Sequence, residues 1–260
     1  MSDKTLKSNF QTNPFYQSLV EIIIPFHNQH SMVAKLYTDV FATVRTNRFV
    51  LTLVDDASKN PHFINDIKNK KVAGVRTFRS DEHKGFGAAV NLALKNPPTR
   101  KVPFVCVLQS DVRLKDTTWL FNLGTSLITL KDAGVKMVSP TTNNPLSDIA
   151  ELMAEGPSES APKELATGYL PMYSFMAHRQ LFAAVGPLKE NPYAGGEAED
   201  YAKRMAEKGY KQGLCPASWV SHEGRGTLRL YDNDKKAQQI LRKNQDGVLG
   251  AAEKVVEENI

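Results

Sequence analysis

The sequence predicts an α/β fold with a mostly parallel central sheet flanked by helices. Short apolar runs rich in β-branched residues alternate with segments of helical period, and this order implies parallel strands joined by right-handed crossovers. Acidic tips follow two of the runs, at Asp55-Asp56 and at Asp111. Because parallel strands end at one edge of a sheet, where such sheets bind ligands, we expect these distant acids to face one pocket.

Composition narrows the class of protein. The chain has 260 residues, 41% of them hydrophobic and 23% charged, as in a soluble globular protein. The net charge of +5 suits anionic ligands such as nucleotides, phosphates, nucleic acid or an anionic membrane surface, without establishing any of them. Cys106 and Cys215 lie in apolar runs and are expected to be buried free thiols. With no signal-peptide core and no apolar run that could cross a bilayer, we expect a cytoplasmic protein with no integral membrane segment.

The first half of the chain contains the most regular alternation. The stretch 102–111 is apolar up to a polar tip of Gln109, Ser110 and Asp111, and predicts a strand buried on both faces. Three other strands are expected over 19–25, 49–54 and 75–78. The helices between them are expected over 32–45 with Ser31 as its cap, after Pro61, and from Gly85-Phe86-Gly87 to Pro97-Pro98.

The second half is less regular. Strands are expected over 136–139, ended by Pro140, over 170–177 and over 214–220, and helices over 116–132, 178–185 and 197–208. The segment 141–165 has no clear period and predicts a long surface loop or a mobile segment, such as a lid or an acceptor loop. We expect an N-terminal arm over 1–18, a single domain over 19–230 with halves 19–112 and 113–230, and a C-terminal helical tail over 231–260.

An ordered set of motifs spans roughly residues 20–225. Ile22 to Asn28, Val54 to Ser58, Gly85 to Asn91 and Leu108 to Asp111 come first, followed by Gly168, Phe182 to Gly186, Gly195 to Tyr201 and His222. In this order and spacing the chain resembles the family 2 glycosyltransferases. The resemblance implies a GT-A fold, with a Rossmann-like sheet and a smaller acceptor-side subregion. It also implies transfer of one sugar from a nucleoside-diphosphate sugar to an acceptor hydroxyl, with inversion. The donor would bind the half 19–112 and the acceptor the half 113–230.

The resemblance also implies roles for residues. Asp56, with Asp55 beside it, would bind the base or ribose, although Asp-Asp-Ala-Ser also favours an ordinary turn. Asp111 and His222 would hold Mn²⁺ or Mg²⁺, with imidazole favouring Mn²⁺, although Asp111 could simply start a turn. Asp200, with Glu199, would be the general base, and both also suit a helix N-terminus. The further expected nucleotide-sugar contacts are Pro25, Phe26, Asn28, Lys84, Gly85, Asn91, Gln109, Ser110 and Arg225.

Departures from the family pattern leave alternatives open. Gln109 replaces the first acid of Asp-x-Asp and brings no charge, and Val90 stands where the family often has arginine. The chain lacks the Gln-x-x-Arg-Trp motif of processive synthases, which favours single-sugar transfer. The expected acceptor is a saccharide or glycoconjugate. The alternatives are a hydroxylated base in DNA, a non-catalytic nucleotide-sugar-binding protein, and another Rossmann-like enzyme such as a nucleotidyltransferase, whose phosphate loop the sequence lacks.

Overall fold

The computed structural model describes residues 15, 17–44, 48–145, 149–166, 168–192 and 195–223. Arg225, the expected tail 231–260 and most of the expected arm 1–18 lie outside these residues. The strands are β1 (Val20–Phe26), β2 (Phe49–Asp55), β3 (Val75–Arg79), β4 (Phe104–Leu108), β5 (Val112–Arg113), β6 (Val135–Thr142), β7 (Lys163–Glu164), β8 (Ser174–His178) and β9 (Lys211–His222). The helices are α2 (His30–Thr43), α3 (His62–Lys70), α4 (Phe86–Lys95), α5 (Trp119–Thr129), α6 (Arg179–Val185) and α7 (Glu197–Glu207), with short 3₁₀ helices at Lys131–Ala133 and Ala150–Leu152.

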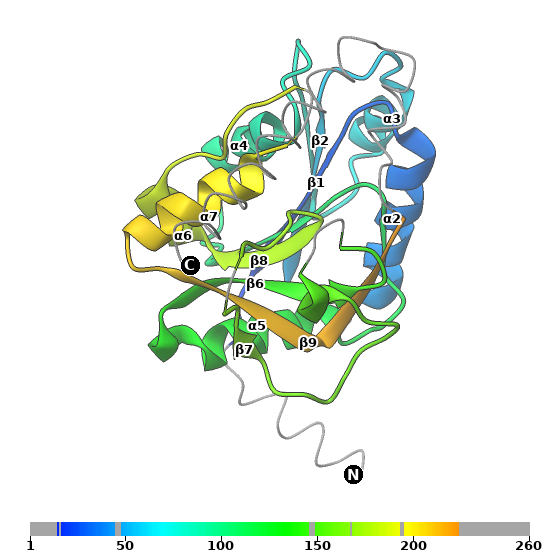
Figure 1. The fold of residues 1–260 in the computed structure, drawn as a ribbon. Helices are drawn as coiled ribbons and strands as arrows, with labels where there is room; N and C mark the ends of the chain where they lie inside the picture. Colours follow the sequence, from blue (N-terminus) through cyan, green and yellow to red (C-terminus); the bar gives the residue numbers. More distant parts are fainter. Residues whose placement is uncertain are drawn as a thin grey trace.

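The described strands form one sheet in the order β3-β2-β1-β4-β8-β6-β9-β5, with β7 also paired to β9 (Figure 1). The strands from β3 to β4 run parallel, as do β6 and β9, whereas β8 runs antiparallel to both β4 and β6. The prediction of an α/β fold with a mostly parallel central sheet is confirmed. The antiparallel β8 separates the first-half strands from those of the second half.

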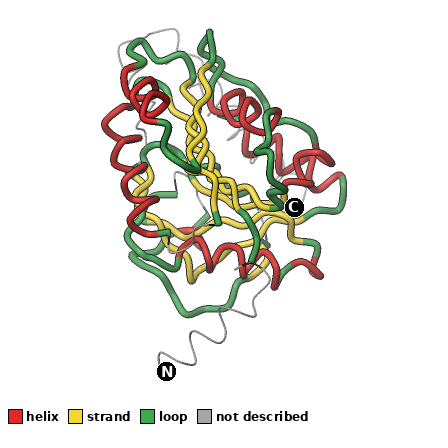
Figure 2. Tube along the Cα trace, turned by 180° about the vertical axis from the view of Figure 1, so that it is seen from behind, coloured by secondary structure: helices red, strands yellow, loops and turns green. Residues whose placement is uncertain are grey.

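Helices cover both faces of the sheet, which therefore has a core on each side (Figure 2). Alternate residues of β1 enter different cores, with Ile22 and Ile24 in one and Ile23 in the other. The first core packs against α2, α3 and α5, and the second against α4, α6 and α7. Burial on both faces explains why the strands are continuous apolar runs rather than alternating ones.

Several local predictions differ from the structure. Ser31 does not cap α2, because the helix begins at His30 and no side chain caps it. Pro140 does not end β6, which continues to Thr142, because proline falls where the pairing with β9 shifts register and its missing N–H costs no ladder bond. The segment 141–165 is partly ordered by packing, since Leu152 is fully buried and Ala154 donates to the carbonyl of Thr142.

Other features agree with the predictions or concern the surface. Cys106 and Cys215 are buried free thiols, and burial raises the pKa of Cys106.

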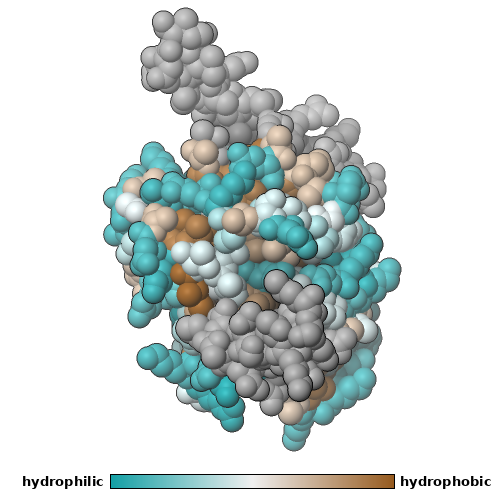
Figure 3. All heavy atoms as spheres, turned by 90° about the horizontal axis from the view of Figure 1, so that it is seen from below, coloured by the Kyte–Doolittle hydropathy of each residue, from teal (hydrophilic) through white to brown (hydrophobic). Residues whose placement is uncertain are grey.

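Among the described residues no helix combines the length and apolarity that a membrane span requires. The face in Figure 3 is largely hydrophilic with scattered apolar patches, and the large hydrophobic side chains exposed in the described part of the chain are Phe41 and Met153. Single exposed apolar residues of this kind are ordinary.

Candidate active site at the strand ends

The strands that carry the predicted site residues end together. β1 and β2 pair in register from Val20 and Phe49 to Phe26 and Asp55. β4 lies on the other side of β1, so its tip follows at the same edge. The parallel pairing therefore places the ends of β1, β2 and β4 at one edge of the sheet, and that the acids at this edge face one pocket stays a prediction.

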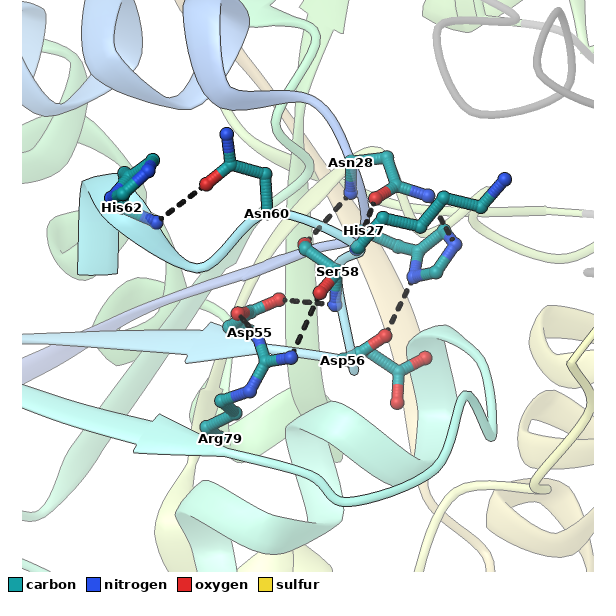
Figure 4. Close-up of polar contacts among 9 residues, drawn as sticks. His27, Asn28, Asp55, Asp56, Ser58, Asn60, His62 and Arg79 are labelled. Carbon is teal, nitrogen blue, oxygen red and sulfur yellow. Dashed lines mark hydrogen bonds and ion pairs between the residues drawn. The ribbon is translucent and has the colours of Figure 1, made fainter. Parts of the chain in front are cut away.

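The turn after β2 is closed by side chains of the turn itself, of the loop after β1 and of β3 (Figure 4). The Asp55 carboxylate accepts the N–H of Ser58 at 2.8 Å and forms an ion pair with Arg79. Asn28 donates its N–H to Ser58 Oγ at 2.9 Å and accepts the N–H of Lys59 at 2.7 Å on Oδ1. Asn28 and Ala57 adopt left-handed backbone angles, with φ of 56° and 55°. The turn interpretation of Asp-Asp-Ala-Ser is thus realised, and Asp55 is its main acceptor.

Asp56 binds the loop before α4. Its carboxylate accepts the N–H of Lys84 at 3.1 Å and of Gly85 at 2.7 Å, and it lies 2.8 Å from Nδ1 of His83. Its backbone carbonyl accepts Nδ1–H of His27 at 2.6 Å (Figure 4). The structure therefore joins the predicted residues Asp56, Lys84 and Gly85 in one hydrogen-bonded group.

Three predicted donor contacts have a structural role in the fold. Pro25 and Phe26 are buried at the end of β1, and the Phe26 ring packs edge-on against Phe63 with ring centroids 6.1 Å apart. The Asn91 amide binds both the N–H and the carbonyl of Leu188 at 2.9 Å. These contacts explain the residue types without a ligand.

Asp111 and His222 meet although they are far apart in the sequence. Val112 in β5 pairs with His222 in β9, which places the preceding Asp111 beside the imidazole. Both side chains are buried, and His222 Nε2 lies 3.4 Å from Asp111 Oδ1. Gln109 and Ser110 lie just before them, where Gln109 donates its N–H to the carbonyl of Tyr173 at 2.8 Å. The predicted metal ligands are therefore neighbours.

The loop after β6 orients the imidazole of His222. The carbonyl of Asn144 lies 2.6 Å from Nδ1, and because a carbonyl oxygen only accepts hydrogen bonds, Nδ1 is the donor here and Nε2 is left facing Asp111. The Asn143 side chain also accepts the backbone N–H of His222 at 2.9 Å. Nε2 is buried and has no hydrogen-bond partner. A lone pair facing a carboxylate oxygen is repulsive unless a proton or a cation lies between them.

The first turn of α7 carries three carboxylates. Arg204 donates to Asp200 Oδ2 from Nε at 2.9 Å and from Nη2 at 2.6 Å, whereas Glu199 is partly exposed. Glu197, which sequence reasoning missed, is only 6% exposed. Its Oε2 accepts the N–H of Gly195 at 2.7 Å, and its buried Oε1 has no partner. Burial raises the pKa of Glu197. The sequence contained no signal for this burial, because Glu197, Glu199 and Asp200 look alike as helix N-terminal acids.

Comparison with known proteins identifies the family. The description "Glycosyl transferase family 2" matches residues 21–150, half of the chain, including the ends of β1, β2 and β4. The chain belongs to glycosyl transferase family 2. The expected family is thereby confirmed, and with it the GT-A architecture, which solved members of this class share with the chain.

Two solved structures illustrate that likeness. One is the mannosyltransferase PcManGT from Pyrobaculum calidifontis in complex with GDP-Man and Mn²⁺, at 16% identity and a TM-score of 0.60 over 84% of this chain. The other is TarS from S. aureus in complex with UDP-GlcNAc, at 15% identity and a TM-score of 0.54 over 78% of this chain. The likeness covers 62% and 58% of those chains, respectively. No curated protein sequence matches the chain.

Proposed function

We propose that the protein transfers one sugar from a nucleoside-diphosphate sugar to an acceptor hydroxyl, with inversion and with help from a divalent cation. The observation that carries the proposal is the buried pair of Asp111 and His222, with an unpartnered Nε2 3.4 Å from a carboxylate oxygen. Family membership supplies the reaction class. The half 19–112 would bind the donor and 113–230 the acceptor, with Asp111 and His222 contributed from one half each.

The residues present fit a divalent cation. Two ligands that each bind one cation at about 2.1 Å, side by side, lie about 3 Å apart, close to the Nε2–Oδ1 separation. The described residues contain no group of three or more His, Cys, Asp or Glu that could hold a metal ion, so this part of the protein offers two ligands. Gln109 and Ser110 add neutral oxygens nearby. Imidazole favours Mn²⁺ over Mg²⁺, and such a cation would neutralise the departing diphosphate.

The donor side would use the turn after β2 and the loop before α4. Asp56 holds the backbone of Lys84 and Gly85, and Ser58 and Lys59 hold Asn28, at the strand ends where the nucleotide of the donor would lie. The Lys84 ammonium is half exposed and lies 3.8 Å from Glu82, so it can turn towards a phosphate. Arg225, outside the described residues, would be a further phosphate contact.

A carboxylate in the first turn of α7 would act as general base. It would take the proton of the acceptor hydroxyl while the new C–O bond forms, and the diphosphate would leave with the electron pair of the old bond. Attack from the face opposite the leaving group inverts the anomeric centre. Asp200 is the base that the sequence predicts. Glu197 is a second candidate, because its Oε1 is unpartnered while Arg204 fixes Oδ2 of Asp200.

The test is turnover with a panel of nucleotide sugars and saccharide acceptors, with and without Mn²⁺. Nucleoside diphosphate should be released only with an acceptor hydroxyl present, and NMR of the product should show an inverted anomeric linkage. Asp200→Asn and Glu197→Gln should be compared, since the variant of the true base should lose more kcat. Turnover that survives Asp111→Ala and also both base variants would refute the proposal.

The same assay separates the alternatives. A DNA acceptor bearing hydroxylated bases should show affinity that falls steeply with salt, because bound phosphates release counterions, whereas a saccharide acceptor should not. Donor binding without transfer or hydrolysis for any acceptor would instead indicate a non-catalytic nucleotide-sugar-binding protein.

A further inference from the structure

The segment 188–192, just before α7, docks along the start of α4. Its contacts follow one another in antiparallel order. Leu188 is held by Asn91 through both of its backbone groups. A Cβ added at Gly87 or Gly85 would overlap the carbonyl oxygens of Lys189 and Asn191, respectively, so both glycines permit close approach of the two backbones.

His83 is the last contact in this series. Its Nε2 lies 2.8 Å from the carbonyl oxygen of Pro192, and its Nδ1 lies 2.8 Å from Asp56 Oδ2. A carbonyl oxygen and a carboxylate oxygen can only accept hydrogen bonds. Both contacts are therefore made together only when both ring nitrogens carry protons.

His27 stacks on His83 with ring centroids 4.0 Å apart. Its Nδ1–H donates to the carbonyl of Asp56, and its Nε2 accepts from the amide of Asn28 at 2.7 Å, which fits a neutral ring. When the stacked pair is protonated, these contacts place the charge on His83 rather than on His27. Burial lowers the pKa of His27. Burial also opposes the charge on His83, but the hydrogen bonds and charge of Asp56 outweigh it and raise the pKa of His83.

The segment held by His83 leads directly to α7. Asn191 Nδ2 donates to the carbonyl of Gly195 at 3.0 Å, and the N–H of Gly195 donates to Glu197 Oε2 at 2.7 Å. Glu197 is the first residue of α7. A continuous series of contacts therefore runs from Asp56, through His83 and the segment 188–192, to the turn that carries Glu197 and Asp200.

We infer that His83 is a positioning residue, whose two ring N–H groups tie Asp56 on the donor side to the turn before α7 on the acceptor side. Its effect on catalysis rests on the proposed function, while the tie itself does not. Other charged groups of this region are Asp55, paired with Arg79, and Glu82, paired with Lys84, together with Asp81 and with Lys189 and Glu190 of the segment 188–192, whereas Asp56 contacts the His83 ring directly. Asp56 is therefore the charge that directly controls His83.

The two contacts of His83 can be tested without a transferase assay. The histidine ring signals of the full chain are followed by NMR from pH 5 to 9. His83, assigned by its loss in His83→Gln, should titrate above 6.5 with both ring nitrogens protonated below its pKa. Asp56→Asn should lower that pKa by about one unit, because an adjacent opposite charge is removed. A His83 pKa at or below 6.5, or one unmoved by Asp56→Asn, overturns the inference.

Thermal unfolding gives a second readout. A pKa raised in the folded state stabilises the protein below pH 6.5, and this contribution is lost as the pH rises through the folded pKa. The Tm difference between wild type and His83→Gln should therefore be largest near pH 5.5 and shrink at higher pH. The control is His62→Gln, whose exposed side chain makes no such contact and whose Tm should follow wild type at every pH. A pH-independent Tm difference contradicts the tie.

The catalytic consequence needs the transferase assay. In His83→Gln, kcat should fall about tenfold with donor KM changed less, because the base is misplaced while the nucleotide still binds. The wild-type kcat should decline as the pH passes the His83 pKa, and the variant should lack that decline. Equal kinetics in His83→Gln and His62→Gln would overturn the positioning role. If no sugar is transferred at all, the proposed function fails while the NMR and unfolding results still decide the tie.

Discussion

The turn at Asp55–Asp56 and the pair Asp111–His222 are two buried polar groups at the strand ends of one sheet, and they differ in completeness. At Asp55–Asp56 the carboxylates accept hydrogen bonds from Ser58, Lys84 and Gly85, and they pair with Arg79 and, when it is protonated, with His83. At Asp111–His222, a buried ring nitrogen faces a carboxylate oxygen at 3.4 Å with no hydrogen bond.

Because of this difference, the two groups give different information about function. Buried polar atoms in proteins nearly always have partners, so one without a hydrogen bond needs an explanation, such as a water molecule, a strained contact or a bound ion. The pair Asp111–His222 therefore supports a bound cation independently of the family resemblance. The turn at Asp55–Asp56 is explained by folding alone, and its role towards a nucleotide rests on the resemblance. Substitutions in the two groups should accordingly fail in different ways.

The largest expected effect is on turnover in Asp111→Asn. Loss of the charged ligand should lower sugar transfer at least about 100-fold, since even outer-shell partners of metal sites contribute 10–100-fold. The folded state should lose little stability, because asparagine keeps the shape of the side chain and one acceptor oxygen. Nucleoside diphosphate release and urea denaturation measure the two effects. Asp132→Asn, on an exposed side chain, is the matched control. A strongly destabilised but active Asp111→Asn would reverse the comparison.

The reverse pattern is expected for stability in Asp55→Ala. Removal of this buried carboxylate leaves the Ser58 N–H and Arg79 without their acceptor. Breaking a buried pair costs about 3–5 kcal/mol, and because Arg79 is partly exposed we expect about 2–3 kcal/mol. Urea denaturation of this variant beside Asp111→Asn checks the contrast. If Asp55→Ala lowered the free energy of unfolding by less than Asp111→Asn does, the contacts of Asp55 would not be what stabilises this turn.

The contrast also shows what sequence could and could not predict. The apolar runs before Asp55 and Asp111 predicted parallel strands and a shared edge, because burial on both faces leaves a direct mark on composition. The antiparallel β8 left no such mark, since strand direction depends on pairing across the sheet. Likewise His222 could be linked to Asp111 only through the family motif, because the pairing of β5 with β9 spans most of the second half.

A third prediction sharpens the comparison through metal binding. Mn²⁺ at 100 times its Kd should stabilise the wild-type fold by about 2.7 kcal/mol, because it binds only the folded state. His222→Gln should abolish most of this gain, while Asp55→Asn should keep it on a lower baseline. Thermal unfolding with and without Mn²⁺, with Mn²⁺ EPR for direct binding, measures it. Equal stabilisation of wild type and His222→Gln would place the cation elsewhere.

The smallest expected effect concerns Glu197, whose buried Oε1 has no hydrogen-bond partner, as is also true of Nε2 of His222. Its pKa is raised by burial, so as the pH rises past 4.5 the unfolded chain ionises first and folding stability falls until the folded pKa is passed. Glu197→Gln removes this loss. It should match wild type near pH 4 and exceed it at neutral pH by about 1 kcal/mol, the lower range for an unsatisfied buried group. Urea denaturation between pH 4 and 8 tests this. A stability difference that shrinks with rising pH would mean that the Glu197 carboxylate is stabilised by its surroundings, and the analogy with Asp111–His222 would fail.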